Sequence, residues 1–355
     1  MWNASSPYAA YAPLFPSPLP ESRYPIYSSH RQQLVPGLSD GITLLVAPII
    51  VYWSFSLMFH FIDNLGWDCF ERYRIHEPDE LKRKNRVSVA QVIRAVIIQQ
   101  IIQTATGWIF VIGVEEPPLD AAGDLNAWGM RVAHVVLSIA GTKRGGEFMA
   151  RYGQQTAEWV YWWGVPTLQM VIAAFVLDGW QYMMHRTAHQ VTFLYRTVHS
   201  WHHRLYVPYA FGALYNHPLE GFALDTCGSV LAHEVVGFTT RQALLFFIIS
   251  TMKTVDDHCG FAFPWDPLQH LTGNNADYHD IHHQVAGLKK NYSQPWFISW
   301  DLFFNTRMTR TEYQTKVAKR VQDGDVPKNQ VNGPNELAAT PTSQRNGVAV
   351  KEKVN

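Results

Sequence analysis

The sequence predicts an all-α integral membrane protein, in which transmembrane helices lead into a histidine-rich helical domain. Three long apolar stretches support this fold class, at about 41–62, 87–114 and 159–180. The first has 22 residues without Lys, Arg, Asp or Glu, which is enough for a helix to cross about 30 Å of hydrocarbon. A soluble protein with three buried helices is disfavoured, because one chain of this size has little room to bury three helices of such length.

The second and third stretches also have features that are expected at a bilayer surface. Arg94 is the only charged residue of 87–114 and lies toward one end, where its long side chain can reach the interface. The third stretch opens with Trp159, Tyr161, Trp162 and Trp163. Trp and Tyr are enriched at membrane interfaces, so both stretches are predicted to be membrane spans.

The segments around the spans are polar. We expect a proline-rich leader over 1–40, spans within 41–180 with a polar connector over 115–158, a histidine-rich domain over 181–306, and a disordered cytosolic tail over 307–355. Lys and Arg number 29, as do Asp and Glu, and this balance argues against a nucleic-acid-binding protein. Three cysteines are too few for a disulfide framework.

Basic residues predict the orientation of the chain in the membrane. The most basic short loop is 63–88, and the positive-inside tendency places it in the cytosol. Two further crossings then leave the chain from His185 onward on the cytosolic side. Lys351 and Lys353 near the carboxyl terminus fit the dilysine form of a retrieval signal for the endoplasmic reticulum, which is read from the cytosol. We therefore expect a multi-pass protein of the endoplasmic reticulum membrane.

Histidines concentrate in one part of the chain, since 12 of the 16 fall between His185 and His283. Eight of these form three clusters with the spacings i, i+3 and i+4, which place side chains on one face of a helix. The clusters are His185 and His189 in HRTAH, His199, His202 and His203 in HSWHH, and His279, His282 and His283 in HDIHH. Neutral imidazole is a common metal ligand, so these clusters predict a metal site.

Two further histidines are predicted to join this set. His217 precedes an apolar segment and His258 follows it, so the stretch of about 222–255 is expected to enter the membrane and return as a hairpin. Glu220, Asp256 and Asp257 are candidate acceptors that would orient the ligand rings. The alternative for each carboxylate is a helix cap or an interfacial charge.

The other histidines are expected to be ordinary hydrogen-bonded residues, among them His60, His134, His233 and His270. Cys259 is an unlikely ligand, because in a helix it would point roughly 100° away from His258. Imidazoles without a cysteine pattern disfavour a structural zinc site. Zinc hydrolysis, copper chemistry and non-haem iron oxidation stay open on this reasoning.

The histidine clusters give the chain a family resemblance. His-x3-His followed by two His-x2-His-His clusters after membrane spans resembles the fatty acid hydroxylase superfamily of integral-membrane di-iron oxygenases. The segments DGWQYMMHRTAH, LYRTVHSWHHRLYVPYAFGALYNHPLEGFALDT, DDHCGFAFPWDPLQ and NNADYHDIHHQ are similar to its sphingolipid 4-hydroxylase branch. The resemblance covers roughly residues 178–304.

This resemblance implies an enzyme, a membrane monooxygenase that hydroxylates sphinganine or dihydroceramide to phytosphingosine or phytoceramide. It implies two non-haem iron ions held by the eight clustered histidines together with His217 and His258. It also implies O2 as co-substrate and electrons from cytochrome b5 and its reductase. Alternatives within the family are a sterol desaturase or oxidase and a fatty-acyl 2-hydroxylase. Outside oxidation, the alternatives are a membrane zinc hydrolase and a non-enzymatic membrane protein.

Overall fold

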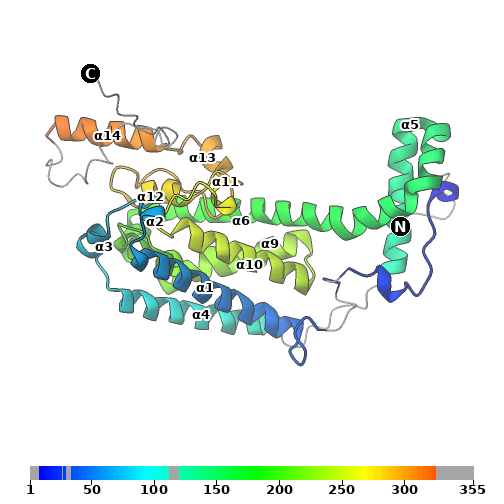
Figure 1. Ribbon diagram of the computed structural model, residues 1–355, viewed down its shortest axis with the longest axis horizontal. Helices are drawn as coiled ribbons and strands as arrows, with labels where there is room; N and C mark the ends of the chain where they lie inside the picture. Colours follow the sequence, from blue (N-terminus) through cyan, green and yellow to red (C-terminus); the bar gives the residue numbers. More distant parts are fainter. Residues whose placement is uncertain (1–7, 26, 29–32, 112–119, 325–355) are drawn as a thin grey trace, which may run out of the picture. The chain divides into compact units, whose positions relative to one another are not determined.

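A computed structural model describes residues 8–25, 27–28, 33–111 and 120–324 of the chain. Its described part is helical, with isolated β-bridges and no β-strand (Figure 1). The α-helices are α1 (Asp40–Leu65), α2 (Asp68–Glu71), α3 (Pro78–Lys84), α4 (Val89–Val111), α5 (Ala121–Trp159), α6 (Val165–Gln190), α7 (Thr192–Thr197), α8 (Pro218–Gly221), α9 (Cys227–Val236), α10 (Thr240–Asp257), α11 (Pro267–His270), α12 (Ala276–His283), α13 (Ser299–Phe303) and α14 (Arg310–Gln322). The predicted retrieval signal at Lys351 and Lys353 lies outside the described residues.

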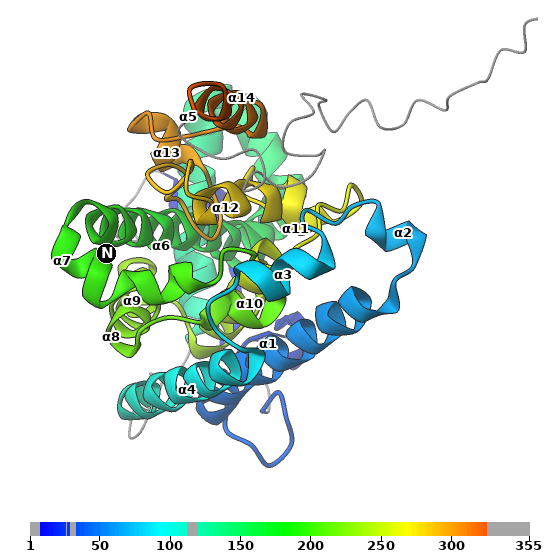
Figure 2. The same cartoon turned by 90° about the vertical axis from the view of Figure 1, so that its left-hand side faces the viewer.

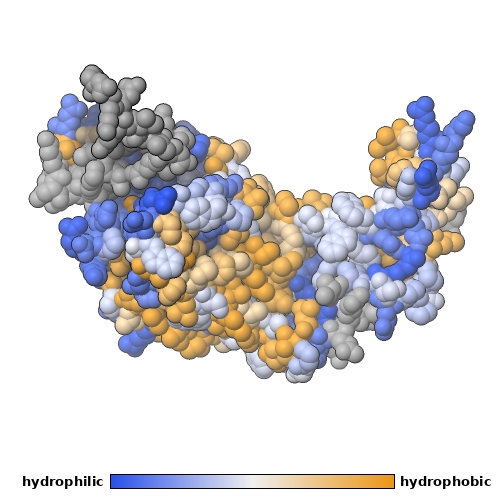
Figure 3. Space-filling model, viewed as in Figure 1, coloured by the Kyte–Doolittle hydropathy of each residue, from blue (hydrophilic) through white to orange (hydrophobic). Residues whose placement is uncertain are grey.

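The membrane assignment rests on two long apolar helices and one bent pair in the described chain. Helix α1 and the helical stretch Ala121–Gln190 are each long and apolar enough to cross a bilayer. Helices α3 and α4 qualify only as a pair, with a bend of 74° between them. Large apolar side chains are exposed along α1 and α4, as the orange surface of Figure 3 shows. The chain is therefore an all-α membrane protein, as the sequence predicts.

The polar connector predicted over 115–158 is a helix in its described part. Helix α5 starts at the N-cap Asp120, whose side chain accepts the backbone N–H of Gly123, and Gly141 interrupts it with φ +74°. Only glycine adopts such a positive φ without strain, so the break falls there. After α5, a π-helical turn over Val160–Gly164 leads directly into α6. The predicted third span is thus the continuation of a much longer helix.

The described residues form two compact units, and the first comprises 1–51, 101–177 and 226–249. Leader residues pack in it, because Phe15, Leu19 and Tyr24 are buried in one cluster with Leu125 of α5 and Trp162. The predicted hairpin region also falls mainly here. Helix α9 ends at Gly237, whose φ of +65° reverses the chain, and α10 follows from Thr240. Two helices therefore flank a glycine cap within the predicted region, and the hairpin that enters the membrane stays a prediction.

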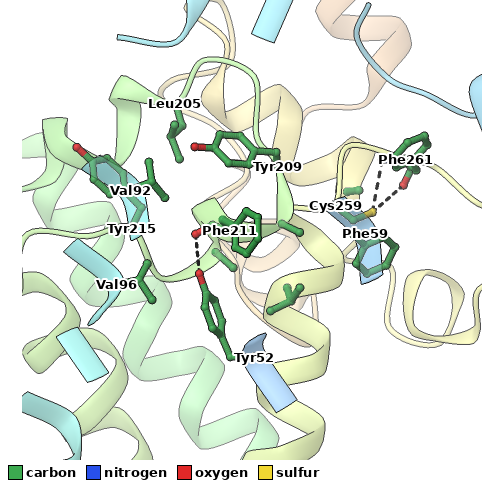
Figure 4. Packing of buried hydrophobic residues seen from close by; sticks show 14 of the residues in the cluster. Tyr52, Phe59, Val92, Val96, Leu205, Tyr209, Phe211, Tyr215, Cys259 and Phe261 are labelled. Atoms are coloured by element: carbon green, nitrogen blue, oxygen red, sulfur yellow. Dashed lines mark hydrogen bonds between the residues drawn. The ribbon is translucent and has the colours of Figure 1, made fainter. Parts of the chain in front are cut away.

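The second unit comprises 52–100, 178–225 and 250–355, and it contains every clustered histidine. Its largest apolar core joins α1 and α4 to the loops around 205–215 and 259–263 (Figure 4). The hydroxyl of Tyr52, which is fully buried, donates to the backbone carbonyl of Phe211 at 2.7 Å. Such packing fixes the loops that follow the second histidine cluster and precede the third.

The predicted disordered tail is wrong for its first part, because residues 310–322 form α14. Thr309 and Glu312 make a capping box at its start, which satisfies two backbone N–H groups that a helix leaves free. Tyr313 and Val317 are buried in a cluster with Ile281 of α12. An apolar face of only two such residues gives little periodicity in the sequence, and the packing against α12 stabilises the helix.

Candidate metal centre

Four separate segments of the second unit carry the clustered histidines toward one another. Helix α6 presents His185 and His189, one turn apart, and α12 presents His279, His282 and His283. These two helices lie side by side in both ribbon views (Figures 1 and 2). The middle cluster lies on a 3-10 turn over His199–Arg204, and His258 directly follows α10.

The histidines gather in two buried groups whose ligand atoms all lie within 4.8 Å of one another in each group. One group has five members: His185, His189, His199, His203 and His282. The other has four: His202, His258, His279 and His283. The groups adjoin, since the ring centroids of His203 and His283 are 5.0 Å apart. Nine of the ten predicted ligands thus come together as two neighbouring sets.

The spacing of the ring nitrogens fits a shared ion in the first group. His189 Nε2 lies 2.7 Å from His199 Nε2, and 3.1 Å from both His203 Nε2 and His282 Nε2. Two nitrogens that each lie about 2.1 Å from one ion are at most about 4.2 Å apart, and all three of these distances are shorter than that. The buried Nε2 atoms of His185 and His258 have no hydrogen-bond partner among the described residues. A metal ion in the first group would satisfy that of His185, and one in the second group that of His258.

Backbone carbonyls determine which nitrogen of several rings faces the centre. Nδ1 of His185 contacts the carbonyl oxygen of Tyr292 at 2.9 Å, and Nδ1 of His282 contacts that of Lys290 at 2.7 Å. In the second group, Nδ1 of His283 contacts the carbonyl of Leu205 at 2.7 Å. Because a carbonyl oxygen can only accept, each Nδ1 carries the proton. The neutral rings therefore turn an unprotonated Nε2 toward the other ligands, as metal coordination requires.

Burial keeps these rings in the neutral form. It lowers the pKa of His199 to about 3, that of His202 to about 4 and that of His258 to about 3. Desolvation disfavours a charged imidazolium, and the crowded neighbouring rings add repulsion for His202 and His258. At neutral pH the rings therefore offer lone pairs instead of protons, which is the state that binds metal.

His217 differs from the prediction, because it belongs to neither group. It is the N-cap of α8, and its Nδ1 accepts the backbone N–H of Leu219 at 3.2 Å. The ring packs edge-on against Trp201, with centroids 4.8 Å apart. Pro218 at the first position of α8 fixes this cap geometry. Cys259 is also outside both groups, as expected, and its Sγ lies 3.3 Å from the carbonyl oxygen of Phe261.

The three candidate carboxylates have different roles. Glu220 accepts a hydrogen bond from Nδ1 of His199, a member of the first group. Asp256 instead accepts from the side-chain amide of Gln269 at 3.2 Å. Asp257 forms a buried ion pair with Lys253. Only Glu220 therefore contacts a clustered histidine in the way that the sequence reasoning proposed for all three.

Two further buried carboxylates support the centre and were missed from the sequence. Asp301 accepts the backbone N–H groups of Tyr292 and Ser293 at 3.0 and 2.6 Å, and so holds the loop whose carbonyl orients His185. Asp280 lies within the third cluster and contacts Nε2 of His76 at 2.6 Å. Asp280 lies between His279 and His282 in the sequence, and this position could have indicated its role. No histidine cluster lies beside Asp301 in the sequence, so nothing local indicated its role.

A small cavity of about 30 Å³ opens beside the two groups, with polar and apolar residues in its walls. Its walls include ligands of both groups, the carboxylates of Glu220, Asp225 and Asp257, and side-chain amides such as that of Gln181. Ala213 and Leu224 add apolar surface. A substrate atom in this cavity would lie beside the metal ligands.

Comparisons with known proteins agree with this geometry. Residues 170–306 match the fatty acid hydroxylase family. A sphingolipid C4-hydroxylase of Saccharomyces cerevisiae is 42% identical over 82% of this chain and 78% of its own length. Sphinganine C4-monooxygenase 1 of Arabidopsis thaliana is 40% identical over 77% of this chain and 89% of its own length. A very-long-chain aldehyde decarbonylase of Oryza sativa subsp. indica is 38% identical over 76% of this chain and 90% of its own length. No solved structure matches the chain. The protein, with its nine gathered histidines, belongs to the fatty acid hydroxylase family.

Proposed function

We propose that this protein is a sphinganine 4-hydroxylase, which adds a hydroxyl group to C4 of a sphingoid long-chain base. One observation carries the proposal: two adjoining, buried, all-imidazole groups occur in a chain that is 42% identical to a sphingolipid C4-hydroxylase over most of its length. Related sphinganine C4-monooxygenases of Arabidopsis thaliana support the same activity.

The reaction requires a redox-active metal centre because C4 is an unactivated methylene. It has no acidic proton and no leaving group, so acid–base side chains alone cannot functionalise it. The balanced reaction takes the substrate C–H, O2, two electrons and two protons to C–OH and water. Two iron ions, when bound, would supply the oxygen-activating chemistry, and the nine gathered histidines would hold them.

The protein's own residues hold and protect this centre. Carbonyl oxygens of Tyr292, Lys290 and Leu205 fix the ring orientation of three ligands, and Glu220 fixes that of His199. All nine ligands are buried, with His282 fully inaccessible to solvent. Exclusion of bulk water limits side reactions of an oxidising site.

The electrons must come from another protein. We propose cytochrome b5 and its reductase as donors, in the endoplasmic reticulum membrane, with the centre on the cytosolic side. The basic loop 63–88 and the apolar helices support this orientation. The long alkyl chain of the substrate would stay among the membrane helices while its head group meets the centre.

The rice relative is named for a different substrate, a very-long-chain aldehyde. The carboxylate and amide side chains among the residues that line the cavity suit a substrate with several polar groups close to the reacting carbon, as a sphingoid base has. This feature supports C4 hydroxylation over aldehyde decarbonylation for this chain.

The test is mass spectrometry of long-chain bases from cells that lack their own 4-hydroxylase, with and without this chain. The proposal predicts a product one oxygen heavier than sphinganine, with the new oxygen derived from isotopically labelled O2. A product labelled from water would contradict an oxygenase. Purified protein that contains zinc without iron, and consumes no oxygen, would favour a zinc hydrolase instead.

A further inference from the structure

The cavity beside the metal ligands has an acidic wall. Glu220 from α8, Asp225 from the π-helical turn Phe222–Thr226 and Asp257 from the end of α10 all line it. Glu220 and Asp257 are 4% and 3% exposed. Among the described lining residues there is no Lys or Arg, so three carboxylates face the cavity without a basic side chain on its walls other than histidine.

The negative charge of these carboxylates is only partly neutralised by neighbouring side chains. Asp257 pairs with Lys253, and Glu220 accepts from His199. Asp225 has only the neutral amide of Gln181, at 3.2 Å. The second oxygens, Glu220 Oε2, Asp225 Oδ2 and Asp257 Oδ2, are buried and have no hydrogen-bond partner in the described part of the chain. Glu220 also repels Asp225 electrostatically.

Unpaired buried carboxylate oxygens are unfavourable unless a donor or a cation satisfies them. An alkylammonium group suits this site because it carries a positive charge and three N–H donors, and it presents no acceptor to the carboxylates. The cavity volume of about 30 Å³ is enough for one such group. A neutral amide has one N–H and no charge, and its acyl group needs more room.

The chemistry of the proposed substrate places an amine at this position. This step rests on the proposed function. The amine of a sphingoid base is on C2, three bonds from the carbon that is hydroxylated, so a group that binds it must lie next to the reacting centre. Asp225 and Glu220 share one cavity with the ligands His185 and His202, as this requirement demands.

We propose that Glu220 and Asp225 bind the protonated amine of a free long-chain base, and that Asp225 determines the preference for this substrate over its N-acylated form. Glu220 has a second role as the hydrogen-bond partner of His199. In the described part of the chain the Asp225 carboxylate forms a hydrogen bond with Gln181 and none with a clustered histidine, so its replacement separates substrate binding from metal binding.

The test compares wild type, Asp225→Asn and the control Asp79→Asn, which alters an exposed carboxylate on α3. Membranes from cells without their own 4-hydroxylase would be assayed with sphinganine and with N-acetylsphinganine, and iron content measured in each variant. Wild type should prefer sphinganine. Asp225→Asn should raise KM for sphinganine about tenfold or more, since a charged hydrogen bond is lost, and should raise KM for N-acetylsphinganine much less, with iron content as in wild type.

Three results would overturn the assignment: an unchanged ratio between the two substrates in Asp225→Asn, a wild type that uses only N-acetylsphinganine, or equal changes in Asp79→Asn. The second would leave the hydroxylase function intact, whereas wild-type inactivity on both substrates would refute the function as well. If Asp225→Asn fails to fold, purified wild type decides the matter. Octadecylamine should then raise its melting temperature more than octadecanol does, and equal shifts would refute the amine site.

Discussion

Asp301→Asn is the substitution by which the support of the metal centre can be tested most directly. The Asp301 side chain is fully buried and each of its oxygens accepts two hydrogen bonds. Oδ1 accepts from the backbone N–H of Tyr292 at 3.0 Å and from the hydroxyl of Thr306 at 2.6 Å. Oδ2 accepts from the backbone N–H of Ser293 at 2.6 Å and from the hydroxyl of Tyr278 at 2.8 Å.

Asparagine replaces one of the two oxygens with an NH2 group, which cannot accept. Either orientation of the amide therefore loses the two charge-assisted bonds at that atom. The backbone N–H is left facing another donor, and the hydroxyl must turn to accept from the NH2 group. Hydrogen bonds to a charged group contribute about 1.5–3 kcal/mol each, so the expected loss is about 3–6 kcal/mol. That is comparable with the whole stability of many domains. The released loop carries the Tyr292 carbonyl that orients His185, so the first histidine group should also bind metal less tightly.

The assay is the thermal melting of detergent-solubilised protein, together with metal analysis of the same sample. Asp301→Asn should melt well below wild type and retain less metal, whereas the exposed Asp79→Asn should match wild type in both. An Asp301→Asn protein with the melting temperature and metal content of wild type would refute the reasoning. It would mean that other contacts hold the loop.

Two other predictions concern single histidines. His282→Ala should remove metal and abolish hydroxylation, while His217→Ala, outside both groups, should retain most of the metal; equal loss of metal in both variants would contradict the nine-ligand set. Burial opposes a charge on His76, but Asp280 and Glu80 raise its pKa from 6.5 to about 9. This contributes at most about 3 kcal/mol of stability, present below pH 6.5 and lost as pH rises through 9. Melting temperatures from pH 7 to 10 should therefore fall more steeply for wild type than for His76→Gln, and parallel curves would count against this ion pair.

The interactions that hold the centre explain why part of it was predictable. Spacings of i, i+3 and i+4 put the histidines of α12 on one side of an α-helix, whereas the 3-10 turn at His199–Arg204 aligns i with i+3 and rotates i+4 by about 120°. In both cases the close spacing of the histidines is a local property of the chain. The clusters were therefore visible in the sequence. His217 has the same residue type, and only its cap geometry beside Pro218 separates it from the ligands.

Helices outside the apolar stretches could not be predicted from hydropathy. Helix α14 was missed because its stability comes from packing against α12, and α5 was missed because its sequence is polar. Hydropathy reports on burial in lipid, so it identifies α1 directly but says little about helices with short or mixed apolar faces.

By itself, the sequence determined that the chain has apolar helices long enough for a membrane and three clusters of closely spaced histidines, because both depend on residues that are near neighbours along the chain. The tertiary structure alone decided how the ligands divide into five and four, and which carbonyls turn each Nε2 inward. It also brought Asp225 to the cavity of His185 and His202. These contacts join segments far apart in the chain, and only their packing in space fixes which atoms meet.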